Sequence, residues 1–293
     1  MSTRARPQSL RPHLLLAYPA LMLGILFLVP FGIMLTISFF HRIEGGFYEP
    51  AFDFANYERF VQAYFLRALL FSLFIAALAA AICVATGFPF TFLLSRFRRR
   101  TQVLWLVFLM SVLSLSEVII GFGWSVLLSR TAGLSHLMVA LGLMSEPQSW
   151  TPGFAAVLCG LCYIAFPYTV LVLYPPLSRL DPELTEAART LGASPLRTFF
   201  TVVVPARRGA ILAALILAFV FTLGSYLLPQ ILGRPQEWTL SVLITDQAIY
   251  NSNLPFAAAL AVFLMIVSLA LIALTLRLGR SGTAERPEPG GAR

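Results

Sequence analysis

The chain has 293 residues, of which 58% are hydrophobic and only 12% are charged, whereas an ordinary soluble domain has roughly 25% charged residues. This composition excludes a soluble globular protein and indicates a chain that lies mostly in lipid. The formal net charge is +8, and all 21 basic residues are arginine. A P-loop of the form GxxxxGK[ST] needs its lysine on the β- and γ-phosphates, so this chain cannot carry a standard one.

Six long apolar stretches predict six transmembrane helices. At about 1.5 Å rise per residue, each can cross a hydrocarbon core of roughly 30 Å with some tilt. Because lipid offers backbone N–H and C=O groups no partner, apolar runs of this length must be helical. The predicted fold class is therefore all-α, a polytopic membrane protein. The spans are expected at about 14–40, 68–94, 103–128, 153–177, 209–233 and 255–276.

The arginines predict the orientation of these spans. Sixteen of the 21 lie in the N-terminal segment, the C-terminal segment and the loops after the second and fourth spans. Since arginine-rich short loops stay in the cytoplasm, both termini are predicted to be cytoplasmic. Membrane topology thus accounts for the net positive charge of the chain, and we do not expect a nucleic-acid partner. We expect a cytoplasmic N-terminus at 1–13, a membrane domain at 14–277 that begins with an uncleaved span, and a disordered cytoplasmic tail at 278–293.

Residues suited to metal binding or catalysis are sparse and scattered. The histidines are spread over an inner end and two outer loops, and the CxxC pair lies inside an apolar span without a second pair, which favours packing over metal or redox chemistry. No metal site, no catalytic constellation and hence no membrane-embedded enzyme is predicted. The residues in question are His13, His41, His136, Cys83, Cys159 and Cys162.

Glu117 is the single formal charge inside the predicted spans, and it lies near the middle of the third one. A carboxylate there costs on the order of 2.5–3.5 kcal/mol unless protein or water shields it. We therefore expect Glu117 to face the interior of the bundle. Two interpretations stay open at this point, a residue that lines a translocation path and a hydrogen-bonded structural carboxyl.

The loop between the fourth and fifth spans, residues 178–208, predicts a pair of short helices. Asp181-Pro182-Glu183 and Ser194-Pro195 each combine an N-cap side chain with proline at the first helical position. Gly192 is expected to end the first helix. Apolar residues at helical spacing give each helix one stripe, formed by Leu184, Ala187, Ala188 and Leu191 in the first and by Leu196, Phe199, Phe200 and Val203 in the second.

The run EAARTLGASPLRTFFTVVVP in this loop resembles the signature of the membrane subunits of type I binding-protein-dependent ABC importers. The matching residues are Glu186, Ala187, Ala188, Gly192, Val202 and Pro205. The resemblance implies that the loop is a coupling helix, which docks in a cleft of a cytoplasmic ATPase. The residues expected to mediate this contact are Glu186, Ala187, Ala188, Leu191, Gly192 and Pro205.

The same resemblance implies the partners and the location of the chain. ATP and Mg²⁺ would be bound by two copies of a partner ATPase, and the chain itself would hold no cofactor and hydrolyse nothing. A second permease subunit, expected to be a paralogue, would complete the pore, and a periplasmic solute-binding protein would deliver the solute. The chain would be a multi-pass protein of the bacterial inner membrane, with lipid as its remaining partner.

Two further segments suggest the solute. GSYLLPQILGRP at 224–235 and NLPFAAAL at 253–260 are similar to the polyamine (spermidine/putrescine) branch of these permeases, and SEVIIG around Glu117 resembles the partner permease of that branch. The expected solute is a polyamine or a similar small cation, with iron, thiamine and phosphonate as alternatives. A secondary transporter driven by an ion gradient is the alternative from another class, but it would be expected to carry several intramembrane ionisable residues and inverted repeats.

Overall fold

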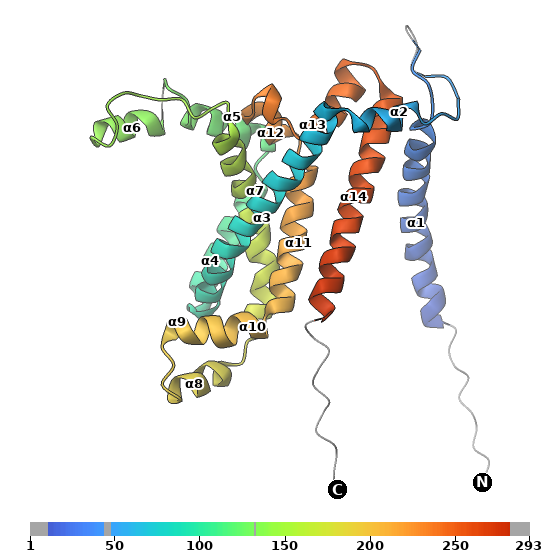
Figure 1. The fold of residues 1–293 in the computed structure, drawn as a ribbon. Coiled ribbons are helices and arrows are strands. Elements are labelled where there is room, and N and C mark those ends of the chain that lie inside the picture. Colours follow the sequence, from blue (N-terminus) through green and yellow to red (C-terminus); the bar gives the residue numbers. More distant parts are fainter. Residues whose placement is uncertain (1–10, 44–47, 132, 282–293) are drawn as a thin grey trace, which may run out of the picture.

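The computed structural model describes residues 11–43, 48–131 and 133–281, and these are helical apart from loops and one β-bridge between His41 and Glu49 (Figure 1). The long helices are α1 (Arg11–Ile37), α3 (Ala63–Arg96), α4 (Arg99–Leu113), α5 (Glu117–Leu127), α7 (Phe154–Ser178), α11 (Arg208–Gly224) and α14 (Leu254–Ser281). The short ones are α2 (Ala55–Glu58), η1 (Arg59–Val61), α6 (Leu134–Ala140), α8 (Pro182–Thr190), α9 (Pro195–Thr198), η2 (Phe199–Val203), α10 (Val204–Ala206), α12 (Leu227–Leu232), η3 (Pro235–Glu237), α13 (Leu240–Thr245) and η4 (Asp246–Tyr250).

The prediction of an all-helical membrane protein is confirmed. Helices α1, α3, α7 and α14 are each long and apolar enough to cross a membrane. Two further pairs pass the same criterion when taken together, α4 with α5 and α9–α10 with α11. These pairs are bent by 93° and 75°, so the described residues hold four candidate spans, or up to six if each bent pair is one span.

Helices α3, α7 and α11 form the centre of the bundle because small side chains line their contacts. Ala76, Ala79 and Ala80 on α3 and Ala156 and Ala165 on α7 are completely buried. Lipid tails are as apolar as leucine, so association of membrane helices depends on close van der Waals packing, which small residues permit. Hydrogen bonds tie α13 to this centre, since the Leu240 amide donates to the Ser72 hydroxyl oxygen of α3 over 2.7 Å and the Ser241 hydroxyl donates to the Leu223 carbonyl of α11 over 2.6 Å.

Three span boundaries differ from the prediction. The third span is broken between α4 and α5, where Ser114 bonds back to the carbonyl of Met110 and Ser116 caps the next helix. Serines that bond to their own backbone bend or end a helix. The fifth span ends early, at Gly224, and α12 follows as a separate helix. The sixth helix continues to Ser281, four residues into the expected tail, and residues 282–293 lie outside the described part.

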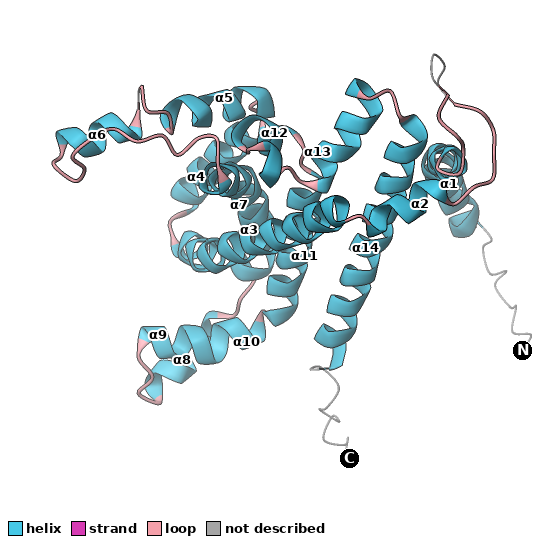
Figure 2. Cartoon of the chain, turned by 45° about the horizontal axis from the view of Figure 1, so that its top comes forward, coloured by secondary structure: helices cyan, strands magenta, loops and turns pink. Residues whose placement is uncertain are grey.

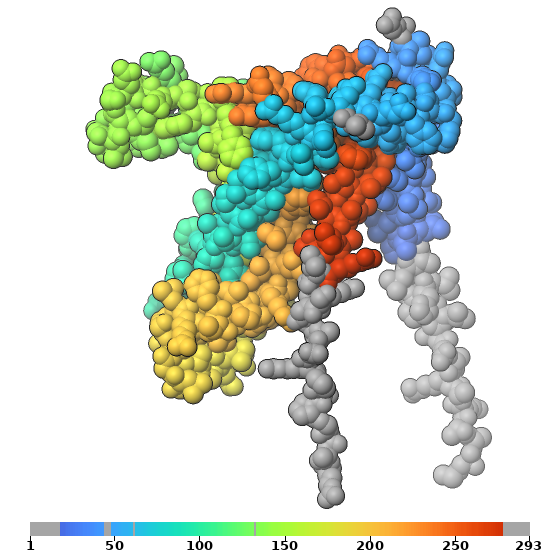
Figure 3. All heavy atoms as spheres, in the orientation of Figure 1, coloured from blue at the N-terminus to red at the C-terminus, as the bar shows by residue number. Residues whose placement is uncertain are grey.

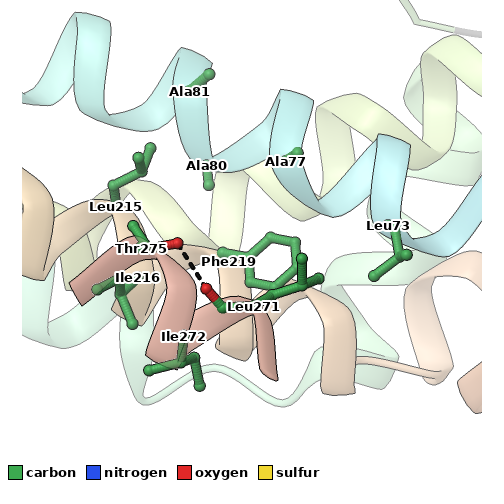
Figure 4. Close-up of a pocket in the computed structure, with 10 residues that line it drawn as sticks. All are labelled: Leu73, Ala77, Ala80, Ala81, Leu215, Ile216, Phe219, Leu271, Ile272 and Thr275. Carbon is green, nitrogen blue, oxygen red and sulfur yellow. Dashed lines mark hydrogen bonds between the residues drawn. The ribbon is translucent and has the colours of Figure 1, made fainter. Parts of the chain in front are cut away.

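Helix α14 is joined to the bundle through its N-terminal half. Its buried side chains include Phe256, Leu260 and Val262, whereas no side chain from Phe263 to Arg277 is buried. An apolar cavity of about 420 Å³ separates the C-terminal half from α3 and α11 (Figure 4). The one hydroxyl at its edge, that of Thr275, donates to the Leu271 carbonyl, so it offers no free proton to the cavity. Helix α14 is thus fixed at one end and loosely packed at the other.

The short helices sort to the two ends of the bundle (Figures 1 and 2). Helices α8 to α10 lie at the end where α1 begins and α14 ends, and they form a lobe of their own in the space-filling view (Figure 3). Helices α2, α6, α12 and α13 lie at the other end, where α6 projects sideways beyond the bundle. This arrangement places both described chain ends on the side of the 178–208 loop.

We predict that a larger side chain at Gly160 of α7 will destabilise the bundle. A Cβ atom there would lie 2.7 Å from Cδ1 of Leu232, whereas one at Gly123 would have no atom within 4 Å. Gly160→Val should therefore cost about 1–3 kcal/mol through overpacking, and Gly123→Val should not. Thermal unfolding midpoints in detergent measure the difference, and equal midpoints for the two variants would contradict this packing.

Candidate functional site: the coupling loop and two helix breaks

The predicted pair of helices in the coupling loop (residues 178–208) is present, and its caps are the predicted ones. The Asp181 carboxylate accepts a hydrogen bond from the Glu183 amide over 3.0 Å. The Ser194 hydroxyl oxygen accepts one from the Arg197 amide over 3.3 Å. Each cap satisfies an amide that has no partner within its helix, and the proline that follows the cap fits the first helical position. These two caps define where α8 and α9 begin.

Gly192 ends α8 in the left-handed conformation, with φ of +83°. The Ala193 amide bonds to the carbonyl of Ala188 over 3.1 Å, and the Gly192 amide bonds to that of Arg189 over 3.0 Å. This is the Schellman pattern, in which a residue with positive φ lets two amides reach back to the last carbonyls of the helix. A glycine suits this position because L side chains rarely adopt such a backbone conformation.

Helix α8 has an unusually large exposed surface. None of its residues is buried, and Glu186 and Ala187 are exposed while Ala188 is half-buried. At its C-cap, Leu191 is 89% exposed. An apolar side chain so open to solvent at the end of a projecting helix is typical of a surface that contacts another protein.

The second helical segment, α9 to α10, faces two ways rather than presenting one stripe. Phe199 and Val203 turn toward the bundle, where Val203 is completely buried and the Phe199 ring lies 5.3 Å from that of Phe92. Leu196 and Phe200 are instead 73% and 65% exposed. The prediction of a single stripe is therefore wrong: the four residues form two neighbouring rows, each with a spacing of four.

Two arginines connect the coupling loop to its surroundings. Arg96, at the inner end of α3, donates to the Thr185 hydroxyl of α8 over 3.5 Å. Arg207 donates to the carbonyl of Arg179 over 3.1 Å, which ties the end of the loop to its beginning. Helix α8 is therefore linked to α3 by one side-chain hydrogen bond, and the two ends of the loop are linked to each other.

Glu117 lies at a helix break and not in the middle of a continuous span. It is the first residue of α5, directly after the 93° bend, and it is half-buried. Within the described ranges, no hydrogen bond or ion pair involves its carboxylate. The expectation that it faces the bundle interior holds only in part, because Ser116 and Val118 on either side are exposed. The Ser116-Glu117 pair is itself an N-cap signal, which would have predicted this break.

A second break, between α11 and α12, lies close to the first in space. Helix α12 packs against α5, and Ile120, Leu228 and Leu232 belong to one buried cluster. Gly121 permits this contact, because a Cβ there would lie 2.9 Å from Cδ1 of Ile231. Membrane transporters form binding sites from discontinuous helices of this kind. Sequence analysis missed this pairing, since it depends on contacts more than 100 positions apart.

The remaining candidates do not form a chemical site within the part of the chain that the structure describes. The Cys83 thiol contacts the Cys162 carbonyl at 3.5 Å, so two cysteines predicted to be separate meet across α3 and α7. His41 pairs with Asp53 at 3.1 Å on the surface. No group of three or more metal-ligating side chains occurs among these residues. His13 lies in α1, in a stretch whose side chains fall outside the description.

The structure is thus an all-helical membrane bundle that carries a capped helix pair at one end, an architecture that a membrane transport subunit can have. Residues 87–281 match the family described as the inner membrane component of binding-protein-dependent transport systems. The chain is also 30% identical over 241 residues to the spermidine/putrescine permease PotB of Escherichia coli K12, covering 82% of this chain and 87% of the relative. The chain therefore belongs to this family of inner membrane permease components.

Other relatives and solved structures agree with this membership. The ABC transporter permease YdcU of E. coli K12 is 27% identical over 288 residues, which cover 91% of this chain and 89% of the relative. A chain of a bacterial alginate ABC transporter has the same fold, with a TM-score of 0.70 at 17% identity over 92% of this chain and 96% of that one. A chain of the MetNI methionine transporter has a TM-score of 0.56 at 17% identity, covering 74% and 94%.

Family membership fixes the general role of the chain. It is the permease subunit of a binding-protein-dependent ABC importer, a multi-pass inner membrane protein and a non-catalytic transport component. This decides against the secondary transporter driven by an ion gradient and against a membrane-embedded enzyme.

We predict that the backbone at Gly192 limits which residues this turn tolerates. No atom lies within 4 Å of a Cβ built there, so a side chain would meet no steric clash with its neighbours. The left-handed backbone conformation alone disfavours most other residues, by about 1–2 kcal/mol. Gly192→Val should speed tryptic cleavage at the exposed Arg189 without lowering the unfolding midpoint. Gly192→Asn is the matched control, because asparagine tolerates positive φ. Identical cleavage rates for the two variants would contradict a turn held by conformation.

Proposed function

We propose that α8 is the element through which a cytoplasmic ATPase drives this permease. The observation that carries the proposal is the projecting, fully capped helix whose exposed side chains include Ala187 and Leu191. An apolar, narrow helix face of this kind fits a groove on a partner. Glu186, Ala187, Ala188, Leu191 and Gly192 form or end this helix, and Pro205 belongs to α10 at the other end of the loop.

An ATP-driven importer that contains this chain needs its ATPase on another subunit. The chain has no lysine for a nucleotide-binding P-loop, so ATP and Mg²⁺ belong to separate subunits, which we take to be two copies. A second permease chain, expected to be a paralogue, and a periplasmic solute-binding protein complete the assembly. The solved alginate transporter with the same fold is described in complex with a substrate-bound periplasmic protein. The two ends of the described chain, Arg11 and Ser281, lie on the same side of the bundle as α8, and this side is cytoplasmic in this proposal.

We predict that charge on the outer face of α8 uncouples the importer. Ala187→Asp introduces a carboxylate at an exposed position, where it would be desolvated on docking. The ATPase should no longer co-purify with the tagged permease, and solute uptake should be lost while the permease remains in the membrane. Ala206→Asp, at an exposed position outside α8, is the control. Unchanged co-purification of the ATPase with Ala187→Asp would refute the docking role.

We propose further that the solute is a polyamine or a similar small organic cation and that Glu117 contributes to its path. The PotB relative is named for spermidine and putrescine transport. Support from the chain itself comes from the break between α4 and α5. A half-buried carboxylate without a protein partner among the described residues is available for a cation, and its cost in a membrane makes a functional role the default expectation.

Two serines that precede Glu117 in the chain also offer acceptor oxygens. Ser111 donates its proton to the Val107 carbonyl over 2.9 Å, and Ser114 donates to the Met110 carbonyl over 3.0 Å. Both side chains are exposed, and their oxygens keep lone pairs that can only accept. In this proposal such acceptors would suit the N–H donors of an ammonium group, whereas the Glu117 carboxylate would repel an anionic solute such as a phosphonate.

We predict that Glu117→Gln reduces polyamine uptake while ATPase docking persists. The substitution keeps the shape of the side chain but removes its charge, and loss of one charge-assisted hydrogen bond should lower uptake about tenfold or more. Radiolabelled spermidine uptake into cells or proteoliposomes measures this, with Glu146→Gln in the exposed outer loop as the control. Normal uptake by Glu117→Gln would remove Glu117 from the path.

A further inference from the structure

An apolar groove lies on the bundle surface between the inner half of α3 and the second helix of the coupling loop. Its volume is about 660 Å³, within the roughly 300–1,000 Å³ that ligand pockets span. Phe88 and Phe92 of α3 and Phe199 of η2 form its floor, while Leu93, Leu196 and Phe200 stand exposed along its edges. All of its lining residues are apolar, so water is a poor occupant.

The length of the groove and the arginines at its end are those expected for a groove that spans one leaflet of a membrane. It extends along α3 from Val84 to Leu93, which corresponds to roughly 14 Å at the helical rise per residue. That is about half of the roughly 30 Å hydrocarbon core. Just beyond its inner end the chain carries Arg96, Arg98, Arg99 and Arg100, all exposed, where the level of the lipid headgroups is expected. A hydrocarbon chain in the groove would therefore bring its headgroup to Arg96, whose side chain contacts Phe92 of the groove lining.

Arg96 is placed to bind such a headgroup. Its guanidinium lies 5.1 Å from the centroid of the Phe92 ring, which belongs to the groove floor. The stacking fixes the guanidinium at the mouth of the groove, where its planar donors can bind a phosphate. The stretch from Val84 to Arg100 carries four arginines and no acidic residue, whereas the acidic residues Asp181, Glu183 and Glu186 belong to the segment around Thr185. The charge at the mouth of the groove thus favours an anion.

We propose that this groove binds an anionic phospholipid of the inner leaflet, with an acyl chain on Phe88, Phe92 and Phe199 and the phosphate on Arg96. Because Arg96 also bonds to Thr185 of α8, the lipid would contact both α3 and the coupling loop. The composition of the inner leaflet would then influence how movement of the coupling loop reaches the bundle. This binding site is separate from the solute path at Glu117.

Lipid counting by native mass spectrometry tests the proposal on the full-length chain. The protein, purified in mild detergent with the subunits it retains, is incubated with equal amounts of phosphatidylglycerol and phosphatidylcholine. We expect phosphatidylglycerol to be retained preferentially and Arg96→Gln to weaken its binding about fivefold, the factor for one arginine near an anionic lipid. Arg100→Gln removes the same charge from the same cluster outside the groove and should leave binding unchanged.

Two further variants distinguish lipid binding in the groove from electrostatic attraction of an anionic headgroup to the arginines. Ala85→Trp and Leu93→Trp add bulk to the groove lining without altering charge, and both should displace the bound lipid. Retention of phosphatidylglycerol by both tryptophan variants, or equal loss with Arg96→Gln and Arg100→Gln, would overturn the proposal. Crosslinking of Leu196→Cys to a second permease chain in the intact membrane would also overturn it, because the groove would then be a subunit interface. None of these measurements depends on transport or on the identity of the solute.

Discussion

The close contact between α3 and α7 is the interaction on which the other helices depend. Fully buried alanines on both helices let the backbones approach, and the buried residues of α7 continue along almost its whole length. Helix α11 joins this pair through Ala214, Ala218 and Thr222. Because lipid provides no hydrophobic drive between helices, larger side chains on these surfaces would loosen the unit that positions both the coupling loop and the helix breaks.

The non-helical backbone at the two ends of the bundle is stabilised in different ways. At the end opposite α8, the breaks after α4 and α11 place α5 and α12 against each other, while Ser114, Leu115 and Ser116 of the first break stay exposed in this chain. Non-helical backbone at membrane depth is tolerated only where protein covers it or where it lines a water-filled cavity, so this break needs one of the two. At the inner end, the coupling loop relies on local caps at Asp181, Ser194 and Gly192. Its shape is therefore defined before any partner is bound.

The features that could be predicted from the sequence are those set by local chemistry. Asp181-Pro182, Ser194-Pro195 and Gly192 fix the coupling loop within a few residues, and long apolar runs fix the helices. The breaks were missed because a window of apolar residues has the same mean hydropathy whether or not it is continuous. Ser116-Glu117 carried the capping signal, but only a long-range contact, such as that of Gly121 with Ile231, shows which helix α5 packs against after the bend.

The split of the second coupling-loop helix into two rows has a similar explanation. Leu196, Phe199, Phe200 and Val203 fit one stripe of an ideal helix, and the sequence contains nothing that separates them. In the structure, Phe199 lies against Phe88 and Phe92, and the segment from Phe199 to Val203 is a wider π-helical turn. The contacts with α3 decide which pair turns inward, so the exposed pair could not be identified without the fold.

Helix α1 stands apart from this arrangement. It packs mainly against α14, and no side chain of Tyr18–Ile37 is buried within the chain. The match to the family begins only at residue 87, far beyond α1. The apolar surface of α1 is thus maintained by the membrane or by neighbouring subunits and not by its own fold. A substitution on this surface would consequently change how α1 meets lipid or a neighbouring chain, and it would leave the alanine contacts between α3 and α7 untouched.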